Sequence, residues 1–160
     1  KVVLASSAGY GFTANLGDLQ TKNKSGKAAI RVNENAKVLD PRSIQNVDED
    51  LLAAITNQGR MLVFPLSELP QLTKGKGNKI IGIPKANFDS GEEFLKEIAV
   101  LGEGRELKLI SGKRHFSIKA KDIENFIGNR GRRGNFLPKG FRNVDGIEVI
   151  ATKESKGEDE

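Results

Sequence analysis

A repeat of about fifty residues is the feature of this sequence that most restricts its possible folds. In the first copy two apolar runs flank Gly9, and in the second copy two similar runs flank Gly59. A polar pair before a glycine is typical of a hairpin turn, because glycine reaches positive φ without steric cost. The sequence therefore predicts a β-hairpin at the same phase of each copy.

The similarity continues beyond each hairpin. Residues 16–19 and 66–69 form equivalent four-residue segments, and a basic stretch that contains glycine follows each of them. Each copy then closes on isoleucine and valine residues at two-residue spacing, over 30–32 in the first copy and 81–83 in the second. This spacing predicts a short strand at both places.

A third and more divergent copy follows. Residues 107–118 again form an apolar run, a turn at Gly112 and a second run. Residues 120–123 take the place of the four-residue segment, and an Arg- and Gly-rich stretch over 128–134 comes next. The sequence therefore predicts a third hairpin with its own basic loop.

Two further segments complete the expected pattern. Residues 88–101 could begin with a short helix capped near Asp89, or could be a loop that leads into a strand at 98–101. The phase of the repeat favours the strand. Residues 147–150 are the predicted last strand.

Repeats of this length built from short strands are typical of propeller blades. We therefore expect an all-β, propeller-like domain over 1–150, with approximate blades at 1–50, 51–97 and 98–150, and a polar tail over 151–160. Closed propellers usually have about four to eight blades. An array of about three blades is thus expected to be a fragment of a larger array that lacks its N-terminal blades; the alternative is an open array.

Composition argues against several classes of function. The chain has no cysteine and one histidine, which argues against Cys-ligated zinc, thiol catalysis and His-rich metal sites. No apolar run approaches the ~20 residues of a membrane helix, so no membrane insertion is expected. The glycine segments lack the spacing of nucleotide loops, since Ile80 stands where a dinucleotide fingerprint needs its third glycine. A structural or surface role is favoured for His115, because no matched nucleophile accompanies it.

Positive charge is the remaining signal. Lys and Arg number 26 against 21 Asp and Glu, and the last ten residues hold four acids against two lysines, so the rest of the chain is more basic still. Three basic loops at one phase of the repeat would form one positive band along equivalent edges of the blades, which suits a phosphate backbone. The candidate DNA-binding residues are Lys22, Lys24, Lys27, Lys74, Lys76, Lys79, Arg130, Arg132 and Arg133.

Alternatives to DNA contact remain open for these loops. They could be solvated hairpin tips in which glycine serves only the turn. Arg132 and Arg133 could instead pair with acids such as Asp122 and Glu124 and close the blade. Four strand aromatics are expected in the core rather than stacked on bases, which favours duplex over single-stranded DNA; they are Tyr10, Phe12, Phe64 and Phe116.

Several stretches resemble the C-terminal domain of the A subunit of bacterial DNA topoisomerase IV, to which the gyrase A subunit is closely related. They are residues 8–12, 59–65, 69–72, 74–81 and 130–134. The resemblance implies a β-pinwheel, in which neighbouring blades exchange strands, and a surface that binds and bends duplex DNA. The family's DNA-cleaving tyrosine lies in a separate N-terminal core, so the resemblance implies no catalytic role for Tyr10 or for this fragment alone.

The resemblance also implies a setting. The whole enzyme is an ATP- and magnesium-dependent type II topoisomerase of the bacterial cytoplasm and nucleoid, whereas this fragment is expected to hold no cofactor. The expected partners are duplex DNA, the separate ATPase subunit of the enzyme and a second A subunit; chromosome-organising proteins are a further candidate. An intact Gln-Arg-Arg-Gly-Gly-Lys-Gly box, the gyrase hallmark, is absent. This favours relaxation and decatenation; the alternatives are gyrase-type wrapping and a propeller that docks acidic protein partners.

Overall fold

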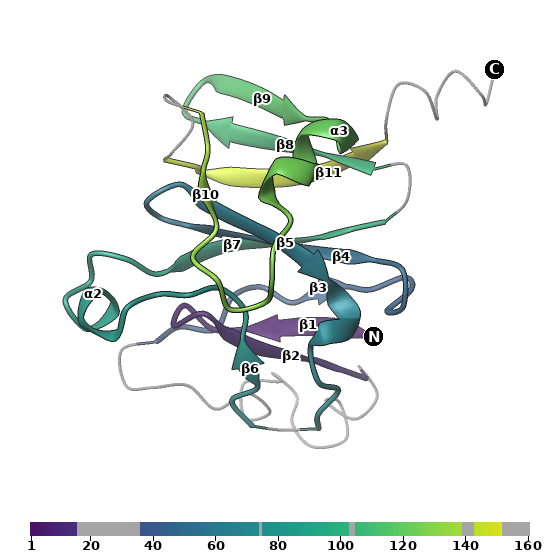
Figure 1. Cartoon of the computed structure of the whole chain (residues 1–160), viewed down its shortest axis with the longest axis vertical. Helices are drawn as coiled ribbons and strands as arrows, with labels where there is room; N and C mark the ends of the chain where they lie inside the picture. Colours follow the sequence, from purple (N-terminus) through teal and green to yellow (C-terminus); the bar gives the residue numbers. More distant parts are fainter. Residues whose placement is uncertain (16–35, 74, 103–104, 139–142, 152–160) are drawn as a thin grey trace.

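The computed structural model describes residues 1–15, 36–73, 75–102, 105–138 and 143–151. Most of their regular structure is antiparallel β-strand, gathered into three sheets that lie one above another (Figure 1). Within these ranges, short helical segments lie in the connections between strands. The predicted all-β, propeller-like class with about three blades is confirmed.

The first sheet has four described strands in the order β3-β1-β2-β6. Strands β1 (Val2–Ala5) and β2 (Tyr10–Ala14) form a hairpin. Strand β3 (Arg42–Ser43) pairs with β1, and β6 (Asn78–Lys79) pairs with β2. The hairpin turns at Gly9, whose φ of 91° lies where glycine is favoured, so this predicted hairpin is confirmed.

Four strands are described in the second sheet as well, in the order β10-β5-β4-β7. Strands β4 (Leu51–Thr56) and β5 (Arg60–Pro65) form the second predicted hairpin, with Gly59 at a φ of 84°. Strand β7 (Leu95–Leu101) pairs with β4, and β10 (Asn135–Phe136) pairs with β5.

The third sheet has three described strands in the order β11-β8-β9. Strands β8 (Arg105–Ser111) and β9 (Arg114–Ile118) form the third predicted hairpin, which turns at Gly112. Strand β11 (Gly146–Ala151) pairs with β8 along its whole length. The predicted last strand at 147–150 is therefore confirmed.

Short helical segments follow the second and third hairpins at equivalent places. Helix η1 (Leu66–Glu68) follows β5, and helices α3 (Ala120–Ile123) and η2 (Glu124–Phe126) follow β9. These positions bear out the equivalence of residues 66–69 and 120–123 that the repeat indicated.

The segment before β7 settles the two alternatives for residues 88–101. Helix α2 (Lys85–Asp89) ends where the alternative helix was to begin, so a helix starting near Asp89 is wrong. The expected strand at 98–101 is confirmed, and it already begins at Leu95. Strand β7 consequently crosses the expected boundary between residues 97 and 98.

Neighbouring repeats exchange strands. Strand β6 belongs to the second repeat but pairs with β2 of the first, and β10 belongs to the third repeat but pairs with β5 of the second. Strand β7 packs against both β3 and β11, so these three strands share one side of the molecule, which we call the inner edge. The opposite ends of the sheets, at β6, β10 and β9, form the outer edge.

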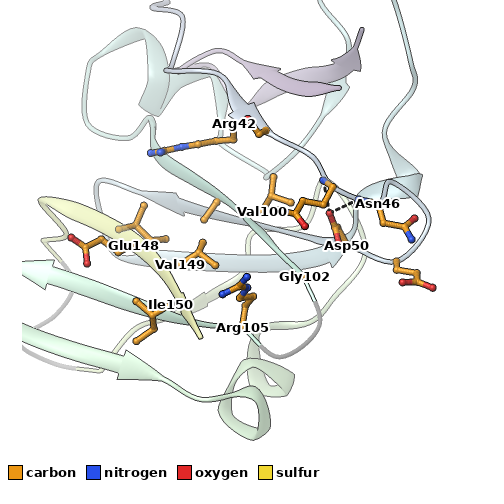
Figure 2. A pocket seen from close by; sticks show the side chains of 14 residues that line it. Arg42, Asn46, Asp50, Val100, Gly102, Arg105, Glu148, Val149 and Ile150 are labelled. Atoms are coloured by element: carbon orange, nitrogen blue, oxygen red, sulfur yellow. Dashed lines mark hydrogen bonds between the residues drawn. The ribbon is translucent and has the colours of Figure 1, made fainter. Parts of the chain in front are cut away.

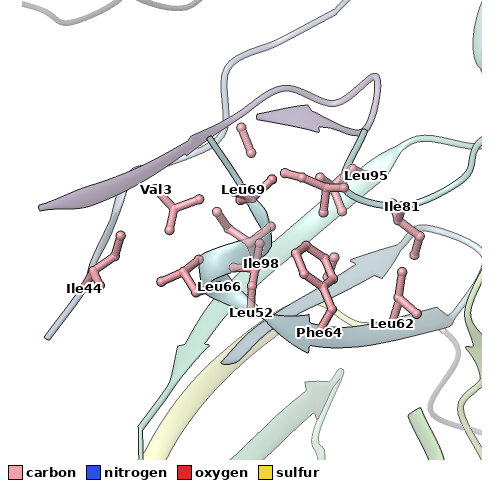
Figure 3. Close-up of a cluster of buried hydrophobic side chains, with 13 residues drawn as sticks. Val3, Ile44, Leu52, Leu62, Phe64, Leu66, Leu69, Ile81, Leu95 and Ile98 are labelled. Carbon is pink, nitrogen blue, oxygen red and sulfur yellow. The ribbon is translucent and has the colours of Figure 1, made fainter. Parts of the chain in front are cut away.

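The middle sheet is buried on both faces, which holds the array together. Alternate residues of β4 enter different cores: Leu52 packs toward the first sheet, and Ile55 packs toward the third. Figure 3 shows Val3 of the first sheet and Phe64 of the middle sheet in the same cluster of buried side chains. A period of two therefore supplies both cores from one hairpin.

The strand expected at 81–83 is not formed. Strand β6 ends at Lys79, and Ile81 lies in a bend. Ile80 and Ile81 are both fully buried in the core between the first two sheets, so consecutive apolar residues act as anchors here rather than alternating across a strand. The equivalent residues 30–32, and the segment 16–19, lie outside the described residues.

Candidate nucleic-acid interface

The second basic loop is seated on the first sheet by a close backbone approach. Gly77 has a φ of 82°, and a Cβ placed there would overlap the backbone of Gly11 in β2. The Ile80 N–H donates to the carbonyl of Gly9 at 2.6 Å. Gly77 thus gives its main chain access to a neighbouring strand, which only a residue without a side chain can do.

The third basic loop is seated on the second sheet in the same manner. Gly134 has a φ of 77°, and a Cβ there would lie 2.5 Å from the carbonyl oxygen of Met61 in β5. The Leu137 N–H donates to the carbonyl of Gly59 at 2.8 Å, as Ile80 does to Gly9. Each loop is therefore carried by the blade that precedes its own repeat.

The two loops also contact each other. The Gly131 N–H donates to the Ile80 carbonyl at 3.0 Å, and the Gly82 N–H donates to the Arg132 carbonyl at 2.7 Å. The Arg130 Nη1 donates to the Lys79 carbonyl at 2.8 Å. We call residues 75–82 and 130–134 together the cationic seam, because these bonds join them into one surface along the outer edge.

The cations of the seam differ in what holds them. Lys76 and Lys79 are exposed, and the Lys76 ammonium lies 4.0 Å from the centre of the Tyr10 ring. The Arg130 side chain donates its hydrogen bond to the Lys79 carbonyl, as described above. Arg132 is exposed, and among the described residues its side chain makes no hydrogen bond or ion pair. Lys22, Lys24, Lys27 and Lys74 lie outside the described residues.

Arg133 has a structural partner. Its Nη1 lies 2.9 Å from Oε1 of Glu93, whose side chain is 0% exposed, while the Arg133 side chain is 37% exposed. The same Nη1 donates to the Gly82 carbonyl at 3.2 Å. Sequence reasoning allowed an acid partner for this arginine but named Asp122 and Glu124. Nothing in the local pattern separates Glu93 from its exposed neighbour Glu92, so the sequence offered no signal for this pair.

A cation lies over an aromatic ring at both exchange junctions. The Arg60 guanidinium lies 4.1 Å from the centre of the Phe136 ring, and its Nη1 donates to the Gly134 carbonyl at 3.4 Å. At the junction of the first and second repeats, the ring of Tyr10 belongs to β2 and the cation Lys76 to the exchanged loop. At the next junction the cation Arg60 belongs to β5 and the ring of Phe136 to the exchanged strand β10. Sequence reasoning missed Arg60 and Phe136, because their partnership depends on strand exchange. It placed Tyr10 in the core, whereas that ring is half-buried beneath Lys76.

A cavity of about 850 Å³ opens on the inner edge, among strands that include β3, β7 and β11 (Figure 2). Its wall mixes acids and bases, including Arg42, Arg105 and Glu148. Arg42 also lies 3.5 Å from Glu97. Burial raises the pKa of Glu97 above its ordinary value of 4.5, although the positive charge of Arg42 opposes this rise. None of the predicted DNA-binding residues that the structure describes lines this cavity, so it is separate from the seam.

Other classes of site are not found in the part of the chain that the structure describes. No group of three or more His, Cys, Asp or Glu side chains is arranged to hold a metal ion there. No described helix has the length and apolar character needed to cross a membrane. The cationic seam is the candidate site that the described geometry supports.

Comparison with known proteins gives consistent matches. The family described as DNA gyrase C-terminal domain, beta-propeller, matches residues 1–45 and 50–100. The A subunit of DNA topoisomerase 4 from Pseudomonas aeruginosa is 52% identical over 147 residues, which cover 92% of this chain and 20% of that protein. The corresponding protein of Escherichia coli K12 is 42% identical over 159 residues, which cover 99% of this chain and 21% of that protein. The chain thus spans about a fifth of the length of the curated relatives it matches.

Solved structures match as well. The Escherichia coli ParC C-terminal domain superposes with a TM-score of 0.82 at 43% identity, covering 94% of this chain and 60% of that chain. A DNA gyrase A C-terminal domain superposes with a TM-score of 0.68 at 14% identity, covering 96% of this chain and 49% of that chain; this match concerns the fold alone. The present structure, with its exchanged strands, is thus similar in fold to the first of these structures.

Proposed function

Because the chain belongs to the DNA gyrase C-terminal domain family of β-propellers, we propose that it binds and bends duplex DNA along its outer edge. The bound duplex is presented to the cleavage core of an ATP-dependent type II topoisomerase of the topoisomerase IV kind. Binding is independent of base sequence, because the contacts are made to phosphates and not to base edges.

The observation that carries this proposal is the cationic seam. Strand exchange brings basic loops from two successive repeats into contact on one edge, where Lys76, Lys79 and Arg132 are exposed. Each cation that meets a phosphate releases condensed counterions, which favours binding most at low salt. A smooth run of such cations suits a backbone better than a compact ligand.

Curvature follows from the stacked blades. Successive loops are mounted on successive sheets, so a duplex that meets both must follow the outer edge. Bending a site of 20–30 base pairs costs of order 1–6 kcal/mol. Additional phosphate contacts along the edge can offset this cost.

The enzyme around this domain is part of the same proposal. A second A subunit, together with a separate ATPase subunit, completes the enzyme, and ATP and magnesium are held by other parts of it. The activity is relaxation and decatenation of DNA during chromosome segregation, in the bacterial cytoplasm and at the nucleoid. The identity of the relatives supports this setting, since they are A subunits of DNA topoisomerase 4.

Salt-dependent binding of a duplex tests the proposal. Replacing Lys74, Lys76 and Lys79 with Ala in the full chain should weaken binding and leave the circular dichroism spectrum native. Loss of three phosphate contacts should lower the slope of log K against log salt by roughly 2.7, at about 0.9 per contact. A control with Lys1, Lys37 and Lys96 changed to Ala removes the same charge near the inner edge, and it should keep more of the slope.

An unchanged affinity and slope in the natively folded seam variant would place this loop off the DNA path. Absence of duplex binding by the wild-type chain would reject DNA binding and favour a propeller that docks acidic proteins. Topology assays separate the remaining alternative, because gyrase-type wrapping introduces negative supercoils whereas the proposed enzyme relaxes and decatenates.

A further inference from the structure

Glu93 is a fully buried acid that the proposed contacts to DNA do not involve. It belongs to the connection between α2 and β7, two residues before the buried Leu95. One carboxylate oxygen, Oε1, lies 2.9 Å from Arg133 Nη1 and accepts a 3.4 Å hydrogen bond from Asn87. The other oxygen is buried and has no hydrogen-bond partner among the described residues. A carboxylate so poorly solvated depends on the guanidinium for compensation.

The guanidinium in turn connects the two halves of the seam. Arg133 Nη1 donates to the Gly82 carbonyl at 3.2 Å, and the Gly82 N–H donates back to the Arg132 carbonyl at 2.7 Å. A Cβ on Gly82 would lie 2.8 Å from the Gly131 carbonyl oxygen, so the two backbones are already at their closest approach. The position of the third-repeat loop relative to the second-repeat loop is thus set around Arg133.

Building on the DNA-binding function proposed above, we propose that Glu93 is a positioning residue for bound DNA. Its carboxylate fixes Arg133, and Arg133 holds residues 130–134 against residues 79–82. The exposed side chains of Lys79 and Arg132 then project at a constant spacing along the outer edge.

Constant spacing affects bending more than affinity. Each strand carries one phosphate for about every 3.4 Å of helix axis, so mobile cations can contact a straight backbone as readily as a bent one. Cations held at one spacing favour the curvature that matches it. Release of the Glu93 contact should therefore reduce bending while the number of phosphate contacts is kept.

The test compares Glu93→Gln with Glu92→Gln in the full chain. Glu92 is the exposed neighbour, and both changes raise the net charge by the same amount, so any general gain in DNA attraction is matched. Energy transfer between dyes on the ends of a duplex of about 30 base pairs reports bending. Glu93→Gln should lose about half or more of the bending signal, while its salt slope stays within about 0.9 of the control, the value of one contact.

A second readout does not involve DNA. Amide hydrogen exchange at Gly82 and Gly131 should be about tenfold or more faster in Glu93→Gln than in Glu92→Gln, because the bonds between the loops open more often. Equal exchange in the two variants overturns the proposal whatever the DNA measurement shows. Equal bending overturns it as well, even if Glu93→Gln lowers the melting temperature, because Glu93 would then be structural only.

Arg133→Lys covers the case in which Glu93→Gln does not fold. Lysine keeps the charge but replaces the rigid guanidinium, whose Nη1 contacts both Glu93 and Gly82, with a flexible ammonium. Reduced bending with an unchanged salt slope supports the proposal, and full bending overturns it. Measurements on the wild-type chain separate the proposed function from the proposed role of Glu93. A wild-type chain that neither binds nor bends DNA rejects the proposed function. Bending by the wild-type chain, with equal bending by the variants, rejects only the role of Glu93.

Discussion

Single glycines decide which strands pair in this molecule. Gly77 and Gly134 have φ values of 82° and 77°, where other residues are strained. Each also lies against the backbone of a strand from the preceding repeat, so that a Cβ would meet a carbonyl group. Each of the two glycines therefore has both a positive φ and a close contact with the backbone of a neighbouring strand.

Gly134→Ala and Gly91→Ala should separate these two contributions. Gly91 has a similar φ of 83°, but a Cβ there would have no neighbour within 4 Å. Gly91→Ala should therefore cost only the backbone strain, about 1–2 kcal/mol. Gly134→Ala should cost about 3 kcal/mol or more, because strand β10 must also move away from Met61. Denaturant unfolding of both variants measures the difference, and equal costs would show that the close approach is unimportant.

The sequence allowed the turn glycines to be predicted but not the glycines at the exchange junctions. A glycine between two apolar runs, such as Gly59, has a local pattern that identifies it. The contact that constrains Gly134 involves Met61, more than seventy positions away, and no local pattern reports it. The same reason hides Glu93, since burial of one of two adjacent glutamates depends on the tertiary fold.

At the level of elements, the exchanged strands are too short to be recognised from periodicity. Strands β6 and β10 have two residues each, and what fixes them is an apolar anchor directly after each strand. Ile80 and Leu137 are almost fully buried and bond to the turn glycines of the preceding blade. The alternating isoleucines at 81–83 predicted a strand, but they mark the anchor that follows one. The three long hairpins, by contrast, were predictable because each has a complete local pattern.

Mutation of the adjacent residues Arg132 and Arg133 should affect different properties, DNA binding in the first case and stability in the second. Arg132→Gln should lower the salt slope of duplex binding by about 0.9 without changing the melting temperature, because its side chain is exposed and makes no described hydrogen bond. Arg133→Gln should lower the melting temperature, because it leaves the buried Glu93 without its ion pair. Salt titrations and thermal melts of both variants check this division.

Two outcomes would contradict that division. A drop in melting temperature for Arg132→Gln would mean that this side chain also supports the fold. An unchanged melting temperature for Arg133→Gln would mean that Glu93 finds compensation elsewhere, and the seam would then be held by its backbone bonds alone.

At the scale of the whole molecule, the middle sheet makes the three sheets one cooperative unit. Its two faces supply residues to the cores on either side of it, and it receives a strand from the third repeat while its own repeat donates one to the first. Loss of either outer sheet would expose a buried face of the middle sheet. We therefore expect the described array to unfold in a single transition.

The single tyrosine provides a test of this cooperativity. Tyr10 lies in the first sheet and the chain has no tryptophan, so tyrosine fluorescence reports the first sheet while circular dichroism reports all three. The two unfolding transitions should coincide. Leu109→Ala in the third sheet should cost about 2–5 kcal/mol and shift the tyrosine transition as well, although Leu109 lies in the other core. A tyrosine transition that ignores this substitution would show that the sheets unfold independently.

Strand exchange has a consequence for inheritance and for engineering. A blade and the charged loop on its outer edge are encoded in different repeats. Genetic recombination at the border between two repeats therefore separates the blade from its loop. If residues 51–101 were replaced by the equivalent repeat of a relative, the new blade would display the host's Arg130–Arg133 stretch, and the donor's own lysines would appear on the host's first sheet. A chimera that is meant to move a blade together with its surface must therefore carry the loop of the following repeat along with it.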